Sequence, residues 1–147
     1  MSGLKDIPIS VIAPPTEPTN GSSGNGAAIL HEIADLLARL ATDGSEGSID
    51  LRALPLTPGD LAQLEGTLAA GAVKVEIDAA GPTDVFETVF PGVWRVRHRN
   101  EAGQTVAEFI EITACPEILK SHADDVREGW VRLRRLLAPA AADAHNE

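Results

Sequence analysis

The chain has 147 residues and 44% of them are hydrophobic, which favours one domain with a substantial core. Its formal net charge of -10 argues against nucleic acid or an anionic membrane surface as a partner. A single cysteine excludes an intramolecular disulfide, and no apolar run approaches the roughly 18 residues of a membrane helix. The first residues do not have the pattern of a signal peptide. We therefore expect a cytoplasmic protein without membrane insertion.

Residues 1–26 are expected to form a flexible tail. They are rich in proline, glycine, serine and asparagine, and such a stretch buries too little apolar area to offset the entropy lost on ordering it. Three apolar residues in it alternate, however, and could add a strand to the edge of a sheet: Ile7, Ile9 and Val11.

A helix is expected next, over residues 27–41, because apolar residues recur there at steps of three and four. They are Ile29, Ile33, Leu36 and Leu40. Gly44 suits the end of this helix. Residues 48–54 then alternate, with Ile49, Leu51 and Ala53 on one face, and this pattern predicts a strand.

A second helix has a clear start. Thr57 can cap it, Pro58 suits its first position, and Asp60 can return a hydrogen bond to the cap, which together make a capping box. We expect its apolar face to comprise Leu61, Leu64 and Leu68, and Gly71 to end it.

Four strands follow as an antiparallel meander over residues 72–113. Alternating apolar residues predict strands at 72–79, 83–90, 93–99 and 105–113, separated by breaks rich in glycine and proline. Pro116 then suits the start of a last helix with one apolar stripe, formed by Leu119, Ala123, Val126, Trp130, Leu133 and Leu137.

The order of these elements predicts an α+β fold: a mostly antiparallel sheet of about four to five strands with about three helices on one face. We expect a single domain over residues 27–138, followed by a frayed tail at 139–147.

Motifs for chemistry are weak in this sequence. Gly24 and Gly26 resemble a phosphate loop, but the third glycine and the lysine of such loops are missing. The four histidines and Cys115 show no metal-ligand spacing, and Cys115 has no histidine placed beside it by sequence. We therefore expect no enzyme activity and no cofactor.

A row of three arginines stands at alternate positions of one predicted strand: Arg95, Arg97 and Arg99. One interpretation is a solvated face with carboxylates as cross-strand partners, and the other is a docking strip for an acidic or C-terminal peptide segment. The pairing register decides: if Arg97 faces Glu108, Arg95 lies near Ile110, whereas a slip by one residue leaves the row unpaired. Trp94, on the opposite face, is expected in the core.

Several segments together resemble a known family. They are "GNGAAILHEIADLL", "IDLRALPLTPGDLAQLEGTL", "ETVFPGVWRVRHRN" and "EFIEITACPEIL", and they include an Ala53-Leu54-Pro55-Leu56 motif and an "ET…GVW" motif with Glu87, Gly92 and Trp94. In this order and spacing they are similar to the conserved C-terminal region of the HupH or HyaF hydrogenase expression/formation accessory family, over about residues 24–119.

The resemblance implies a bacterial, non-catalytic accessory protein of nickel–iron hydrogenase maturation. Our hypothesis is an assembly chaperone that binds a hydrogenase subunit precursor, and possibly other maturation proteins, through a surface comprising Glu87, Gly92, Trp94, Arg95, Arg97 and Arg99. The alternative is a carrier of a metal or cluster intermediate that uses Cys115 and a histidine. A third possibility is a homodimer, formed by the last helix or a strand edge, which would not exclude the chaperone role.

Overall fold

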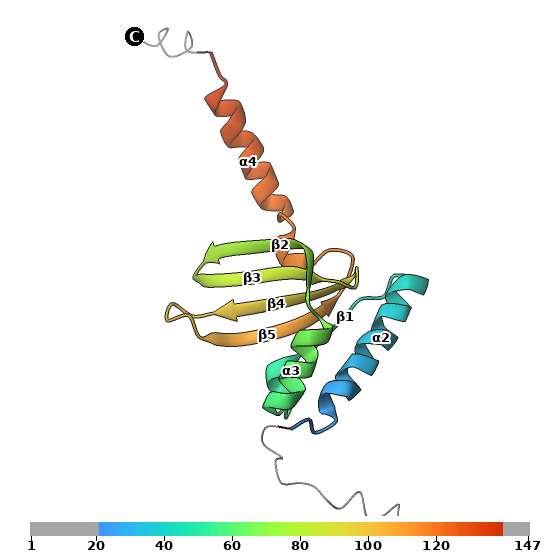
Figure 1. The fold of residues 1–147 in the computed structure, drawn as a ribbon. Helices are drawn as coiled ribbons and strands as arrows, with labels where there is room; N and C mark the ends of the chain where they lie inside the picture. The colour runs from blue at the N-terminus through green and yellow to red at the C-terminus, as the bar shows by residue number, and fades with distance from the viewer. Residues whose placement is uncertain (1–20, 140–147) are drawn as a thin grey trace, which may run out of the picture. The chain divides into compact units, whose positions relative to one another are not determined.

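The computed structural model describes residues 21–139, which are drawn in colour in Figure 1. They belong to two compact units, one ending at Ala114 and one beginning at Cys115. The predicted strand at Ile7, Ile9 and Val11 lies outside the described residues, as does nearly all of the predicted C-terminal tail. The domain expected over 27–138 includes parts of both units.

The first unit is built on an antiparallel sheet of five strands in the order β1-β5-β4-β3-β2. The strands are β1 (Gly47–Asp50), β2 (Ala70–Ala79), β3 (Gly81–Thr88), β4 (Val93–Arg99) and β5 (Thr105–Ile112). The last four form the predicted meander, and β1 adds to its outer edge by pairing with β5. The antiparallel sheet with helices confirms the α+β class.

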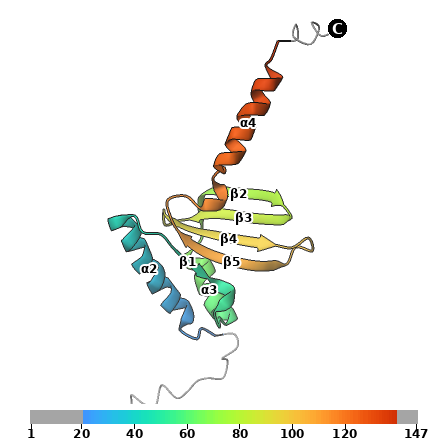
Figure 2. The same cartoon turned by 180° about the vertical axis from the view of Figure 1, so that it is seen from behind.

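Two helices in this unit, α2 (Asn25–Asp43) and α3 (Pro58–Thr67), lie side by side in both views of the molecule (Figures 1 and 2). The buried core comprises Ile29, Ile33, Ile49, Leu51, Leu64, Leu68, Val93, Ile110 and Ile112. These side chains come from both helices, from β1, β4 and β5, and from the turn after β1. One face of the sheet is therefore packed against α2 and α3.

The capping box at the start of α3 is confirmed. The Asp60 backbone N–H donates to Thr57 Oγ1 over 3.1 Å, and the Thr57 N–H donates back to the Asp60 carboxylate over 3.0 Å. The helix ends at Thr67, however, so the expected end at Gly71 is wrong. The Val89 N–H already donates to the Ala69 carbonyl, and pairing with β3 begins at Ala70, which draws the chain into β2 before Gly71.

The segment before α2 is held against the start of α3 by the buried Asp60 carboxylate. This carboxylate accepts from the Ser22 hydroxyl and from both the hydroxyl and the backbone N–H of Ser23. The hydrogen bond from the Ser23 hydroxyl, helped by the backbone N–H of Thr57, keeps the pKa of Asp60 far below its usual range. The boundary expected at residue 26 falls inside α2.

The expected strand over residues 48–54 is only half realised. β1 ends at Asp50, whose side chain accepts from the Arg52 N–H over 3.0 Å, and Leu51–Ala53 form a single 3-10 turn, η1. Ile49 and Leu51 are buried as expected, whereas Ala53 is exposed. The side-chain cap closes the 3-10 turn, and pairing with β5 therefore stops at Asp50.

The second unit contains a 3-10 helix, η2 (Glu117–Leu119), and α4 (Ala123–Leu136). The expectation of one continuous helix from Pro116 is wrong, because Lys120 and His122 have extended backbone conformations. His122 caps α4 by accepting the Asp124 N–H at its Nδ1. Of the helices that the structure describes, none has the length and apolar character needed to cross a membrane.

Candidate functional site

The arginine row lies on β4 in the register that pairs it. Arg97 stands opposite Glu108 of β5, and Arg95 stands opposite Ile110. Because Ile110 belongs to the core under the helices, the row begins on the helix-covered face of the sheet. Arg95 is 3% exposed, so the expected solvated face is wrong at this position.

A four-membered ion cluster surrounds the first two arginines. Arg95 Nη2 lies 2.9 Å from Glu65 Oε2 and also binds Glu108 Oε2. Arg97 Nη2 lies 3.4 Å from the same Glu65 oxygen and 3.3 Å from the same Glu108 oxygen. The Arg95 guanidinium also lies 5.6 Å from the centroid of the Phe86 ring on β3, within cation–π range. The cluster thus ties α3, which carries Glu65, to three adjacent strands.

Hydrogen bonds within the cluster favour the charged forms of Arg95 and Glu65. Burial disfavours the charged form of Arg95, but the hydrogen bonds from its guanidinium to Glu65 and Glu108 outweigh that cost, and the pKa of Arg95 is raised. The hydrogen bond from Arg95 lowers the pKa of Glu65 in return. The cluster contains two arginines and two carboxylates, and Arg97 is its partly exposed arginine.

Arg99 forms a separate pair at the far end of the strand. Its Nη2 lies 2.9 Å from Asp84 Oδ2 on β3. The side chains of Arg97 and Arg99 are each 29% exposed, so these two members of the row reach solvent while Arg95 does not. A partly exposed pair of this kind stabilises the fold by about 1 kcal/mol at most.

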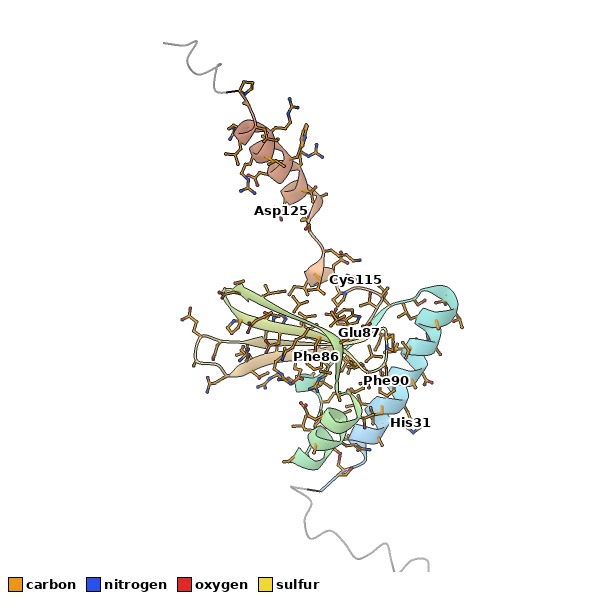
Figure 3. All side chains as sticks on the ribbon, turned by 45° about the horizontal axis from the view of Figure 1, so that its top comes forward. His31, Phe86, Glu87, Phe90, Cys115 and Asp125 are labelled. Atoms are coloured by element: carbon orange, nitrogen blue, oxygen red, sulfur yellow. The ribbon has the colours of Figure 1, made fainter. Side chains whose placement is uncertain are left out.

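Glu87 and Gly92 shape the turn between β3 and β4. The Gly92 N–H donates to Glu87 Oε2 over 3.0 Å. Gly92 has a φ of 93°, and a Cβ there would lie 3.1 Å from Leu37 Cδ1 on α2. The positive φ favours glycine at this position, and the turn lies close to the side chain of Leu37. Figure 3 labels Glu87 on β3 and Phe90 in the turn that follows it.

Trp94 is buried, as expected, on the opposite face of β4 from Arg95. Its indole Nε1–H donates to the Thr113 carbonyl over 3.0 Å, just beyond the end of β5. The Thr113 hydroxyl in turn donates to Glu46 over 2.6 Å, just before β1. The "GVW" part of the motif thus fixes how β4, β5 and the start of β1 meet.

Sequence reasoning missed Glu65 as a member of the site. It considered carboxylates on the neighbouring strands, but Glu65 comes from α3, and the docking of a helix on a sheet cannot be read from local periodicity. It also missed an apolar pocket of about 170 Å³ beside the β3–β4 turn, lined by Leu30, Ile33, Ala34, Leu37, Thr67, Leu68, Phe90 and Val93. Phe90 itself stays 43% exposed at its rim.

The histidines that the structure describes have separate positions. His98 Nδ1 is 2.9 Å from the Thr83 hydroxyl, His122 caps α4, and His31 is exposed on α2. Cys115 Sγ contacts the carbonyl of the next residue, Pro116. Among residues 21–139, no three side chains of histidine, cysteine, aspartate or glutamate are grouped as a metal site would require.

Comparisons with known proteins agree on one family. The sequence model described as "HupH hydrogenase expression protein, C-terminal conserved region" matches residues 24–139. The solved structure of the hydrogenase expression protein HupH from Thiobacillus denitrificans is similar, with a TM-score of 0.75 and 43% identity. That match covers 80% of this chain and 98% of the other.

Curated relatives are more distant and longer. The hydrogenase expression/formation protein HoxQ from Cupriavidus necator is 31% identical over 77% of this chain, and HupH from Rhodobacter capsulatus is equally identical over the same share. The matched region covers 40% of the first relative and 41% of the second. The chain therefore spans well under half the length of the curated relatives it matches.

Proposed function

Because the chain belongs to the family of HupH hydrogenase expression proteins, through the C-terminal conserved region of that family, we propose that it is a non-catalytic accessory protein of nickel–iron hydrogenase maturation. In this proposal it binds a hydrogenase subunit precursor. The observation that carries the proposal is the family match over residues 24–139, together with a HupH structure that is 43% identical.

The site supports a binding role in a particular way. The side chains that carry the family resemblance stabilise local structure: Glu87 and Gly92 hold a turn, and Trp94 is hydrogen-bonded in the core. Arg95 is buried in its ion cluster. The members of the row that reach solvent are Arg97 and Arg99, and we assign the charge contacts with a partner to these two.

The test is affinity capture of the tagged chain from cells that co-express it with the large-subunit or the small-subunit precursor of a hydrogenase. One precursor should be enriched with the wild-type chain, and other maturation proteins in the same capture would be further partners. Failure to enrich either precursor would refute the proposed function.

A variant with Arg97→Ala and Arg99→Ala then tests the surface. It should retain the fold but capture less precursor, because the two exposed cations are lost. A variant with Arg39→Ala and Arg52→Ala removes the same charge from α2 and η1 and serves as the matched control. Equal capture by the two double variants would refute the assignment of the surface while leaving the function intact.

A further inference from the structure

α4 carries an apolar stripe that is exposed along its whole length. Val126, Trp130, Leu133 and Leu137 follow one another at steps of four, three and four, which places them on one face of the helix. Their exposed fractions are 58%, 56%, 57% and 74%. No residue of α4 is buried. An isolated tryptophan on a surface is ordinary, but four large apolar side chains in one row indicate a contact surface.

The second unit cannot supply the cover for this stripe. Besides α4, its described part, residues 115–139, contains the three-residue helix η2 as its only regular element. A helix of 14 residues is marginally stable in water on its own, and most helices depend on packing of their apolar face. The apolar side chains of the stripe can therefore be buried only by a surface from outside this unit.

The charges beside the stripe indicate the chemistry of that occupant. Arg127 and Arg134 are seven residues apart and lie along the same flank of the stripe. The Arg134 guanidinium sits 5.5 Å from the centroid of the Trp130 ring. Within the described part of the chain, no carboxylate forms an ion pair with either arginine. Asp124 is three residues before Arg127, but its carboxylate lies 3.8 Å from His122 Nδ1 and forms no ion pair with Arg127. Glu128 lies on the opposite face of the helix.

A second copy of the chain is a poor occupant. If two α4 helices pair antiparallel through their stripes, Arg127 of one copy comes close to Arg134 of the other, and like charges repel. If they pair in parallel, the arginine flank meets the flank that carries Gly129 and Leu136, where Asp125 is the one carboxylate of the helix. A single carboxylate per copy leaves at least one of the two cations without a charged partner.

We propose that α4 is a docking helix whose stripe binds an apolar groove with an acidic rim on a partner protein. In this arrangement Trp130 and Leu133 enter the groove, and Arg127 and Arg134 pair with aspartates or glutamates along one edge of it. The surface is separate from the arginine row on β4. The inference does not depend on the partner being a hydrogenase subunit.

An anionic membrane is the other surface that a helix of this kind can meet. The observations favour protein, because the whole chain carries a formal net charge of -10 and would be repelled from anionic lipid. An acidic groove on a protein, in contrast, can form local ion pairs with the two arginines, while the rest of the partner's surface lies too far from this chain to be repelled by its net charge.

The experiment is photo-crosslinking in living cells with the full chain, in which Leu133 is replaced by p-benzoylphenylalanine. We expect a covalent adduct with one partner protein, mapped by mass spectrometry to apolar residues that have aspartate or glutamate neighbours. Replacement of Arg127→Glu together with Arg134→Glu should reduce the adduct at least about tenfold. Replacing the mapped acidic residues of the partner with lysine should restore it.

The matched control is Arg132→Glu with Arg135→Glu, which changes the charge equally on the side of α4 away from the stripe. It should leave the adduct unchanged. Equal loss with both charge reversals would overturn the proposal, as would an adduct with a second copy, with residues 21–114 of the same chain, or with no protein at all. Co-sedimentation with vesicles of phosphatidylcholine and phosphatidylglycerol, lost in the Arg127/Arg134 variant, would overturn it in favour of a membrane.

Discussion

Arg95 shows how a charged residue becomes part of a core. Its guanidinium is removed from water, and two carboxylates and an aromatic ring replace the lost hydration. Ion pairs in such a place add little net stability compared with apolar residues of the same size, but removing one partner leaves a buried charge behind. We therefore expect the cluster to fix how α3 docks on the sheet rather than to add net stability.

This asymmetry predicts different costs for the two carboxylates. Glu108 is 14% exposed, and Glu108→Gln removes a buried charged partner of Arg95, which should lower the free energy of unfolding by about 2–3 kcal/mol. The cost is not larger because Arg95 keeps Glu65 as a charged partner. Glu65 is 57% exposed, and Glu65→Gln should cost less than about 1 kcal/mol. Urea denaturation followed by the fluorescence of buried Trp94 measures both. Equal costs would show that Glu108 does not hold Arg95 as the geometry implies.

The face on which the arginines lie could not be predicted from the sequence. Strict alternation placed Trp94 and Val96 inside and the arginines outside, which is correct for a strand that is buried on one side. Both faces of β4 are buried at its start, however: Val93, Trp94, Arg95 and Val96 are all inaccessible. The sequence is compatible with two registers between β4 and β5, because a cross-strand charge pair favours the observed register but does not determine it.

At the scale of elements, sequence patterns predicted correctly those helix boundaries that depend on contacts between residues a few positions apart. The capping box of α3 depends on residues three positions apart, so the sequence alone shows it. The end of α3 depends on the pairing of Ala70 with Thr88 of β3, 18 residues further along the chain, so local signals misplaced it. The break before α4 has a local signal that was overlooked, because His122 precedes Asp124 and Asp125 as a cap precedes an acidic first turn.

The position of Gly71 in β2 leads to a prediction at this scale. A Cβ at Gly71 would lie 2.7 Å from the Thr88 carbonyl oxygen, which belongs to the backbone of β3 and cannot move without disturbing the sheet. Gly71→Ala should therefore lower the free energy of unfolding by about 1–3 kcal/mol. A nearly neutral substitution would show that the backbone at Gly71 can move away from Thr88 without cost.

Gly66 provides the control for this substitution. It lies in the last turn of α3, and a Cβ there meets nothing within 4 Å. Gly66→Ala should be neutral or stabilising by up to about 1 kcal/mol, because alanine favours the helix. Thermal unfolding of the two variants side by side distinguishes a steric clash from a general effect of removing glycine.

At the scale of the whole molecule, the two units have different sources of stability. The first has a core assembled from two helices and three strands, so its sheet should open only on global unfolding. α4 has no buried residue, so its hydrogen bonds depend on helix propensity and capping. Amide hydrogen exchange in the free chain should accordingly be fast over Ala123–Leu136 and slow over β3, β4 and β5.

Gly129→Ala tests whether α4 is an independent unit in this sense. Gly129 lies in the middle of the helix, and a Cβ there meets nothing within 4 Å, so the substitution should stabilise α4 by about 1 kcal/mol without touching anything else. Exchange over Ala123–Leu136 should slow up to about fivefold, which is that energy expressed as a ratio, while exchange in residues 21–114 stays the same. Slowing in both units would mean that they unfold together. In that case the stripe on α4 would already be buried cooperatively with the sheet in solution, and the helix would not be available to an acidic partner.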